Sequence, residues 1–126
     1  KITSLFLIII FCSQASAQDF NVQASGRLIL GPYKERTASI SCGDIDGDGD
    51  NDMVVANGRH WPGQNRIFIN DGRGIFTVER NLGTDRATTY ATELADLDND
   101  GELDIAAGND MAPNYTFLND GHGHFT

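Results

Sequence analysis

Residues 44–52 read DIDGDGDND, and residues 96–104, which begin 52 positions later, read DLDNDGELD. Both stretches follow the pattern D-x-D-x-D-G-x-x-D, with carboxylates at the first, third and fifth positions and glycine at the sixth. Ca²⁺ takes six to eight oxygen ligands at about 2.3–2.6 Å, and glycine permits the sharp bend that folds a loop around such an ion. The two stretches therefore predict two loops that each bind a hard cation.

Two other interpretations of the acidic stretches are disfavoured. An EF-hand loop needs a bidentate Glu at position twelve and flanking helices, but position twelve is Val55 in one stretch and Ala107 in the other. The alternation of residues 38–43 before the first stretch is that of a half-buried strand. An ion-free acidic turn is opposed by charge, because two carboxylates about 5 Å apart repel by roughly 3 kcal/mol at an effective dielectric constant near 20.

The sequence around the acidic stretches repeats with them. Corresponding segments are residues 38–43 and 90–95 before the stretches, 53–55 and 105–107 after them, and 70–74 and 119–123 at an N-D-G-x-G turn. No segment beyond the N-terminus has the spacing of an amphipathic helix. Units of about 50 residues with four short strands each indicate an all-β fold with about two four-stranded antiparallel blades of a larger β-propeller. The units are expected at about residues 30–79 and 82–126.

The order of these motifs, with N-D-G-x-G-x-F after an apolar strand, resembles the FG-GAP or VCBS-type repeat from about residue 30 to residue 126. That family builds the β-propeller heads of integrin α chains and of many secreted bacterial proteins. The resemblance implies about two Ca²⁺ ions, one per loop. The implied side-chain ligands are Asp44, Asp46, Asp48 and Asp52, and then Asp96, Asp98, Asp100 and Asp104. The backbone carbonyls of Asp50 and Glu102 would complete the two sets. One departure is Asn51, where the family usually has an apolar residue such as Leu103.

Charge and the N-terminus indicate the setting in which the chain works. A formal net charge of -9 leaves no basic stripe for nucleic acid. Residues 1–17 have a positive start, an apolar run and an A-x-A site, which together predict a cleaved signal peptide rather than a stable membrane span. We therefore expect a secreted, extracellular or periplasmic protein whose repeat region is residues 18–126. Its one remaining cysteine, Cys42, aligns with Leu94 and is expected to be a small buried hydrophobe.

The function expected from these features is binding or adhesion at an extracellular surface. Arg59, His60 and Trp61 lie in the longer connection of the first unit and include the only tryptophan. Trp61 would either contact a glycan or protein ligand or pack between neighbouring blades. No G-x-S-x-G or H-E-x-x-H motif supports catalysis in this segment. The alternative is an accessory or groove-bearing propeller of a secreted polysaccharide-degrading enzyme. Propellers close with 4–8 blades, so the remaining blades are expected on the same, longer chain, with assembly of several copies as the alternative.

Overall fold

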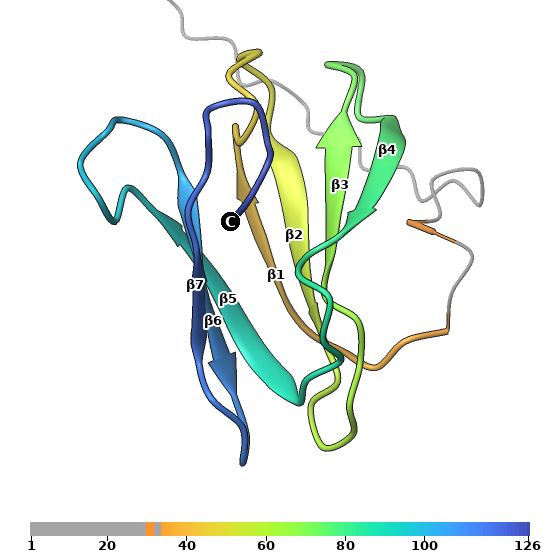
Figure 1. Cartoon of the computed structure of the whole chain (residues 1–126). Helices are drawn as coiled ribbons and strands as arrows, with labels where there is room; N and C mark the ends of the chain where they lie inside the picture. The colour runs from red at the N-terminus through yellow and green to blue at the C-terminus, as the bar shows by residue number, and fades with distance from the viewer. Residues whose placement is uncertain (1–29, 32–33) are drawn as a thin grey trace, which may run out of the picture.

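The computed structural model describes residues 30–31 and 34–126, and every regular element in these residues is a β-strand. The expected signal peptide, residues 1–17, lies outside the described residues, as does the start of the repeat region up to residue 29. The strands form one four-stranded and one three-stranded antiparallel sheet (Figure 1). Their bounds are β1 (Thr37–Gly43), β2 (Asp52–Asn57), β3 (Arg66–Asn70), β4 (Phe76–Asn81), β5 (Thr89–Ala95), β6 (Asp104–Asn109) and β7 (Tyr115–Phe117). Within these residues the structure contains no helix of sufficient length and apolarity to span a bilayer.

The two sheets are copies of one unit, as the sequence predicts. The sheet orders are β1-β2-β3-β4 and β5-β6-β7, so each acidic stretch joins the first two strands of its sheet. The irregularity in pairing between Thr37 and Ser39 of β1 recurs between Thr89 and Ala91 of β5. Equal strand order and an equal bulge, 52 residues apart, confirm two tandem blades.

The second blade differs from the first at its outer edge. After β7 the chain makes the second N-D-G-x-G turn, and Asn119 pairs with Phe125 in an isolated bridge. Leu118 and Thr126 exchange two backbone hydrogen bonds of 3.1 and 3.0 Å. The second sheet therefore has three strands and the first pairing of a fourth.

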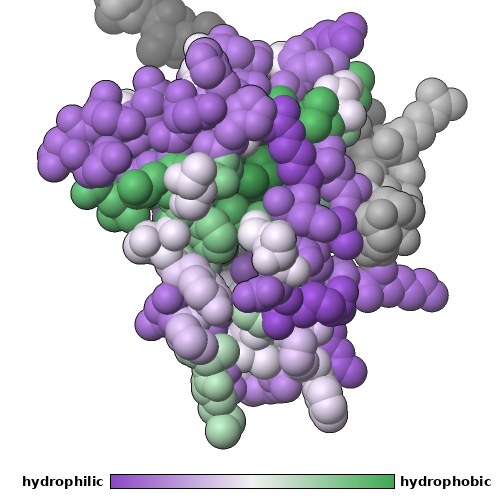
Figure 2. Space-filling model, in the orientation of Figure 1, coloured by the Kyte–Doolittle hydropathy of each residue, from purple (hydrophilic) through white to green (hydrophobic). Residues whose placement is uncertain are grey.

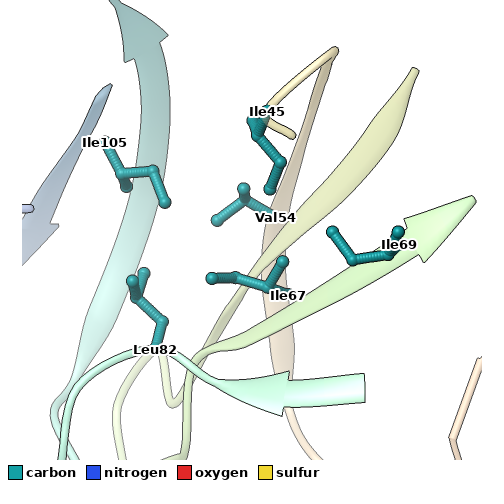
Figure 3. Packing of buried hydrophobic residues seen from close by; sticks show 6 residues of the cluster. All are labelled: Ile45, Val54, Ile67, Ile69, Leu82 and Ile105. Carbon is teal, nitrogen blue, oxygen red and sulfur yellow. The ribbon is translucent and has the colours of Figure 1, made fainter. Parts of the chain in front are cut away.

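The hydrophobic core lies between the two sheets (Figure 3). Six aliphatic side chains, each at most 8% exposed, form its centre: Ile45, Val54, Ile67, Ile69, Leu82 and Ile105. Full burial of such a side chain contributes about 1.5–3 kcal/mol. Ile45 belongs to the first acidic loop, and Leu82 belongs to the connection between the sheets. The packing of the two blades therefore also anchors the first loop.

The opposite face of the first sheet is less covered, and this corrects one expectation. Cross-strand pairing places Ile40 opposite Val55 and Cys42 opposite Met53 on that face, away from Val54. Cys42 is exposed and Ile40 is 51% exposed. The prediction that Cys42 is buried is therefore wrong, because the first blade covers its repeat partner Leu94 whereas no strand of the described residues covers Cys42.

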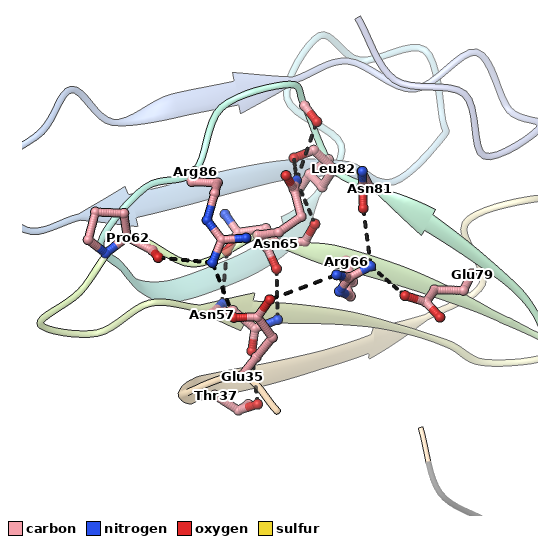
Figure 4. Close-up of polar contacts among 12 residues, drawn as sticks. Glu35, Thr37, Asn57, Pro62, Asn65, Arg66, Glu79, Asn81, Leu82 and Arg86 are labelled. Carbon is pink, nitrogen blue, oxygen red and sulfur yellow. Dashed lines mark hydrogen bonds and ion pairs between the residues drawn. The ribbon is translucent and has the colours of Figure 1, made fainter. Parts of the chain in front are cut away.

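A polar network joins the sheets where β2, β5 and β6 begin or end, and Figure 4 shows its residues Asn57 and Asn65. The side-chain carbonyl of Asn65 accepts from Asn57 N over 2.8 Å, and its amide donates to Thr89 Oγ1 over 2.8 Å. The Thr89 hydroxyl in turn donates to Asn109 Oδ1 over 2.7 Å. Asn57, Asn65 and Thr89 are buried, so these bonds satisfy groups that water does not reach.

All acidic loops and N-D-G turns gather at one end of the molecule. In Figure 1 the chain between β1 and β2, the chain between β5 and β6, and both N-D-G turns lie at the upper end. The connection between β2 and β3 lies at the lower end. Figure 2 shows hydrophilic residues over the upper end and an apolar band next to it.

Candidate metal centres

The first acidic loop is folded by its leading aspartate. Asp44 Oδ1 accepts hydrogen bonds from Gly47 N and Asp48 N over 2.8 and 3.2 Å, and its Oδ2 accepts one from Gly49 N over 2.9 Å. Gly47 and Gly49 have φ angles of +78° and +93°, which glycine adopts without steric cost. The Asp44 carboxylate thus accepts three backbone hydrogen bonds that hold the loop in a tight turn around it.

The second loop repeats this arrangement bond for bond. Asp96 Oδ1 accepts from Asn99 N and Asp100 N over 2.7 and 3.2 Å, and its Oδ2 accepts from Gly101 N over 3.1 Å. Asn99 replaces the glycine of the first loop at φ +66°, a conformation that asparagine tolerates better than most residues. Two different sequences therefore build the same loop.

In the first loop three carboxylates converge. Asp44, Asp46 and Asp48 each offer an oxygen atom, and these atoms lie within 4.8 Å of one another. Asp46 Oδ1 is buried and has no hydrogen-bond partner among the described residues. A buried carboxylate oxygen without a donor is costly, and a cation between the three side chains would satisfy it. This donor set of carboxylate oxygens fits a hard metal ion.

In the second loop the converging set is different. Its oxygen atoms, also within 4.8 Å of one another, come from Asp96, Asp98 and Asp104. Asp100 is not one of the three, and its Oδ1 accepts a hydrogen bond from Glu102 N over 2.9 Å. The geometry is therefore suited to a metal ion in both loops, with Asp52 outside the converging set in the first and Asp100 outside it in the second.

The ninth aspartate of each loop has a structural role that the sequence did not predict. Asp52 is fully buried, and its two oxygens accept from Ile45 N over 3.1 Å and from Asn70 N over 2.8 Å. Asp104 is equally buried, and its oxygens accept from the backbone N–H groups of Leu97 and Asn119, each over 2.8 Å. Each carboxylate thereby ties its acidic loop to the N-D-G turn of the same blade.

The acidic residue at the seventh position of each loop, Asp50 or Glu102, contacts the N-D-G turn of its blade with its side chain. A Cβ on Gly72 would collide with the carboxylate of Asp50, and one on Gly121 would lie 3.1–3.3 Å from the side chain of Glu102. Both glycines have φ +78°. The glycine of each N-D-G turn therefore makes room for the acidic side chain of its loop, and a ligand role for the backbone carbonyls of Asp50 and Glu102 stays a prediction.

Crowding of carboxylates alters their protonation. Burial raises the pKa of Asp52, and the charges of Asp46 and Asp48 add to this, against the opposing effect of its two backbone hydrogen bonds. Desolvation, followed by the charge of Asp100, raises the pKa of Asp98. A divalent cation in either loop would offset the charge repulsion that contributes to these shifts.

The remaining candidate residues are not near the loops. Arg59, His60 and Trp61 lie in the connection between β2 and β3, at the other end of the sheets. Trp61 is 63% exposed, so it does not pack between the two described blades. The sequence-predicted site residues therefore divide into an acidic end and a separate patch around Trp61.

Two tandem antiparallel blades, each with a metal-competent acidic loop between its first two strands, define a protein of the β-propeller repeat type. A family model described as an FG-GAP-like repeat matches residues 44–107. The chain belongs to the FG-GAP-like repeat family. No curated protein and no solved structure matches the chain significantly.

Proposed function

We propose that the chain is a secreted, calcium-binding segment of a β-propeller that serves as an extracellular binding platform for a glycan or a protein. The observation that carries the calcium assignment is the convergence of three carboxylates with the unpartnered oxygen of Asp46. Ca²⁺ accepts variable, oxygen-only coordination, whereas Mg²⁺ demands near-ideal octahedral geometry. Export is supported by the signal-peptide pattern of residues 1–17.

The bound ions would hold each blade together at its acidic end. The Asp52 and Asp104 carboxylates connect each loop to the N-D-G turn of its blade, so a cation that orders the loop also orders the turn. Extracellular calcium modules have dissociation constants near 10⁻⁴–10⁻³ M. Occupancy at ten times the dissociation constant adds about 1.4 kcal/mol of stability per site.

Further blades of a longer chain would complete the platform. Ile45 is 1% exposed under the second blade, and Asn119 Nδ2 donates to its carbonyl over 2.8 Å. Its repeat partner Leu97 is 43% exposed, and Leu118, on the same blade, is 39% exposed. A third blade that packs as the second does would cover these side chains, and in a closed ring the last blade would cover Cys42.

Calorimetric titration of the full chain with Ca²⁺ tests the proposal. We expect two sites per chain, with Asp46→Asn and Asp98→Asn each removing one. Asp71→Asn is the matched control, because this carboxylate lies at the same end but pairs with Arg73 over 2.6 Å and belongs to neither converging set. A chain that binds no Ca²⁺, or an Asp71→Asn variant that loses a site, would overturn the assignment.

A further inference from the structure

The connection between β2 and β3, residues 58–65, is held in a defined position by the next repeat. Arg59 N donates to the carbonyl of Thr89 over 3.1 Å. Gly63 and Ala87 exchange two backbone hydrogen bonds of 2.9 and 3.1 Å. The exposed side chains of this connection therefore extend from a backbone that hydrogen bonds hold in one conformation.

The exposed surface of the connection is aromatic. Trp61 is 63% exposed even though the guanidinium of Arg36 lies 5.6 Å from the centre of its ring. Beside it, the Tyr90 hydroxyl lies 2.6 Å from His60 Nδ1, and their rings meet edge to face. Aromatic rings with polar tips that stay in water are typical of binding surfaces.

Positive charge surrounds these rings in a chain that carries a formal net charge of -9. Lys34, Arg36 and Arg86 line a hollow of about 190 Å³ beside Trp61. Glu35 is the one carboxylate among the residues that line the hollow. It lies 3.6 Å from Arg86 and 3.8 Å from Arg66, a pairing that Figure 4 shows. Arg86, together with Arg66 that Glu79 also pairs with, thus neutralises Glu35. Within the described part of the chain Lys34 and Arg36 form no ion pair, so we expect their charges to meet the ligand.

The chemistry of this surface favours a sugar over a peptide strand. Strand addition requires backbone N–H and C=O groups along an open strand edge. Here the backbone N–H groups of Gly58, Arg59 and Trp61 already donate hydrogen bonds within the chain. A ligand would therefore be recognised by the indole ring and the charged side chains. An indole offers a flat apolar face, and guanidinium pairs with carboxylate or sulfate in a fixed geometry.

We propose that the Trp61 patch, formed by Lys34, Arg36, His60, Trp61, Arg86 and Tyr90, binds an acidic oligosaccharide. A sugar ring lies against the indole of Trp61, and a carboxylate or sulfate group pairs with Lys34 and Arg36. This inference rests on the binding function proposed above and gives its ligand class. It also gives the molecule two working ends: cations at the acidic loops and anionic sugar at the Trp61 patch.

Binding of four probes to the full chain in millimolar CaCl₂ tests the inference. The probes are tetragalacturonate, a sulfated tetrasaccharide, neutral maltotetraose and tetraglutamate. At least one acidic sugar is expected to bind about tenfold or more tighter than maltotetraose and tetraglutamate. Trp61→Ala and Arg36→Gln should each weaken that binding about tenfold, and Trp61→Phe should retain part of it.

Arg73→Gln is the matched control. It removes one positive charge from a side chain that is 78% exposed at the acidic end, and the affinity for the acidic sugar should stay unchanged. The inference is overturned if maltotetraose or tetraglutamate binds as tightly as the acidic sugars, or if Arg73→Gln weakens binding as much as Arg36→Gln. It is also overturned if Trp61→Ala has no effect, because the ligand would then lie elsewhere.

The same samples distinguish this failure from failure of the proposed function. A chain that takes up Ca²⁺ but binds neither acidic sugar overturns the ligand class and leaves the calcium-binding platform in place. A chain that takes up no Ca²⁺ overturns the proposed function itself, whatever its affinity for sugars.

Discussion

At the residue scale, the two kinds of aspartate in each loop do different work. The convergence of the carboxylates at positions one and three could be predicted from spacing alone, whereas position five converges with them only in the first loop. The role of Asp52 and Asp104 could not be predicted, because the pattern does not tell which carboxylate turns inward to backbone N–H groups. Burial in the folded chain shows which carboxylate turns inward, since Asp52 and Asp104 are both 0% exposed.

The buried clamp should therefore matter even without metal. Asp52→Asn replaces one carboxylate oxygen by an amide that faces a backbone N–H, and we expect a loss of about 2 kcal/mol in the free energy of unfolding. Urea unfolding in the presence of a chelator measures it. Asp48→Asn removes the same charge from an exposed side chain and should be neutral or slightly stabilising. Equal losses in the two variants would contradict the clamp.

Protonation of the crowded carboxylates makes the stability of the folded chain depend on pH, and the pKa shifts give the sign of this contribution. The pKa values of Asp52 and Asp98 are raised in the folded chain, so the folded state binds more protons than the unfolded state between the ordinary value of 3.8 and the raised values. This contribution is present below pH 3.8 and is lost as the pH rises through the folded-state pKa values. The lowered pKa values of Asp71 and Asp120 act in the opposite sense, so the contribution is measured, without calcium, as the difference in melting temperature between the unmodified chain and a variant that lacks one of the raised groups.

Asp98→Asn provides the comparison, because it removes one of the two carboxyl groups whose pKa is raised. As the pH rises through this range, its melting temperature should increase relative to that of the unmodified chain. In the presence of calcium the sign reverses, since protons compete with the ion for the same oxygens. A calcium-free melting curve with the same pH dependence in both chains would contradict the crowding.

At the scale of elements, the strands could be predicted because the apolar segments have the residue pattern of strands and not that of helices. Each strand pairs with the strands next to it in sequence, because the Asp loops and N-D-G turns make the connections short. What the patterns miss is which face of a sheet is covered, because that depends on the neighbouring blade. Cys42 and Leu94 occupy equivalent places in β1 and β5, yet only Leu94 packs against the core.

Thiol labelling in the native state checks this difference. Cys42 is exposed and should react with a thiol reagent at nearly the rate of the unfolded chain. In a Cys42→Ser background, a cysteine introduced as Leu94→Cys should react about tenfold more slowly, because the first blade covers it. Similar native rates at the two positions would show that the two blades do not pack as described.

The asparagines at the strand ends were also missed, because asparagine near a turn signals only the turn. Asn65 is buried and bonds to Asn57 and Thr89, whereas its repeat partner Asn114 is exposed and bonds to Asn109 N over 2.8 Å. Asn65→Ala should cost about 1–3 kcal/mol in the free energy of unfolding, since it leaves buried groups unpaired. Asn114→Ala should cost less than about 1 kcal/mol, because water replaces the lost bond. Equal costs in urea unfolding would contradict the difference in burial.

At the scale of the whole molecule, the fold separates two chemistries. Both acidic loops and both N-D-G turns lie at one end, and the cationic, aromatic Trp61 patch lies at the other. The sequence predicted the tandem blades because their motifs recur at a constant interval. It predicted His60 and Trp61 as candidate ligand-binding residues but not the cationic part of the patch, since Lys34, Arg36 and Arg86 are brought to Trp61 from segments before and after the first blade.

The central claim is that a calcium ion lies within each acidic loop. A crystal structure of the chain grown in millimolar CaCl₂, with anomalous data, tests this most directly. The account predicts one anomalous peak in each loop, with Asp46 Oδ1 bound to the ion in the first and Asp98 bound in the second. Ordered loops without a peak, and with these carboxylates turned out to solvent, would contradict it.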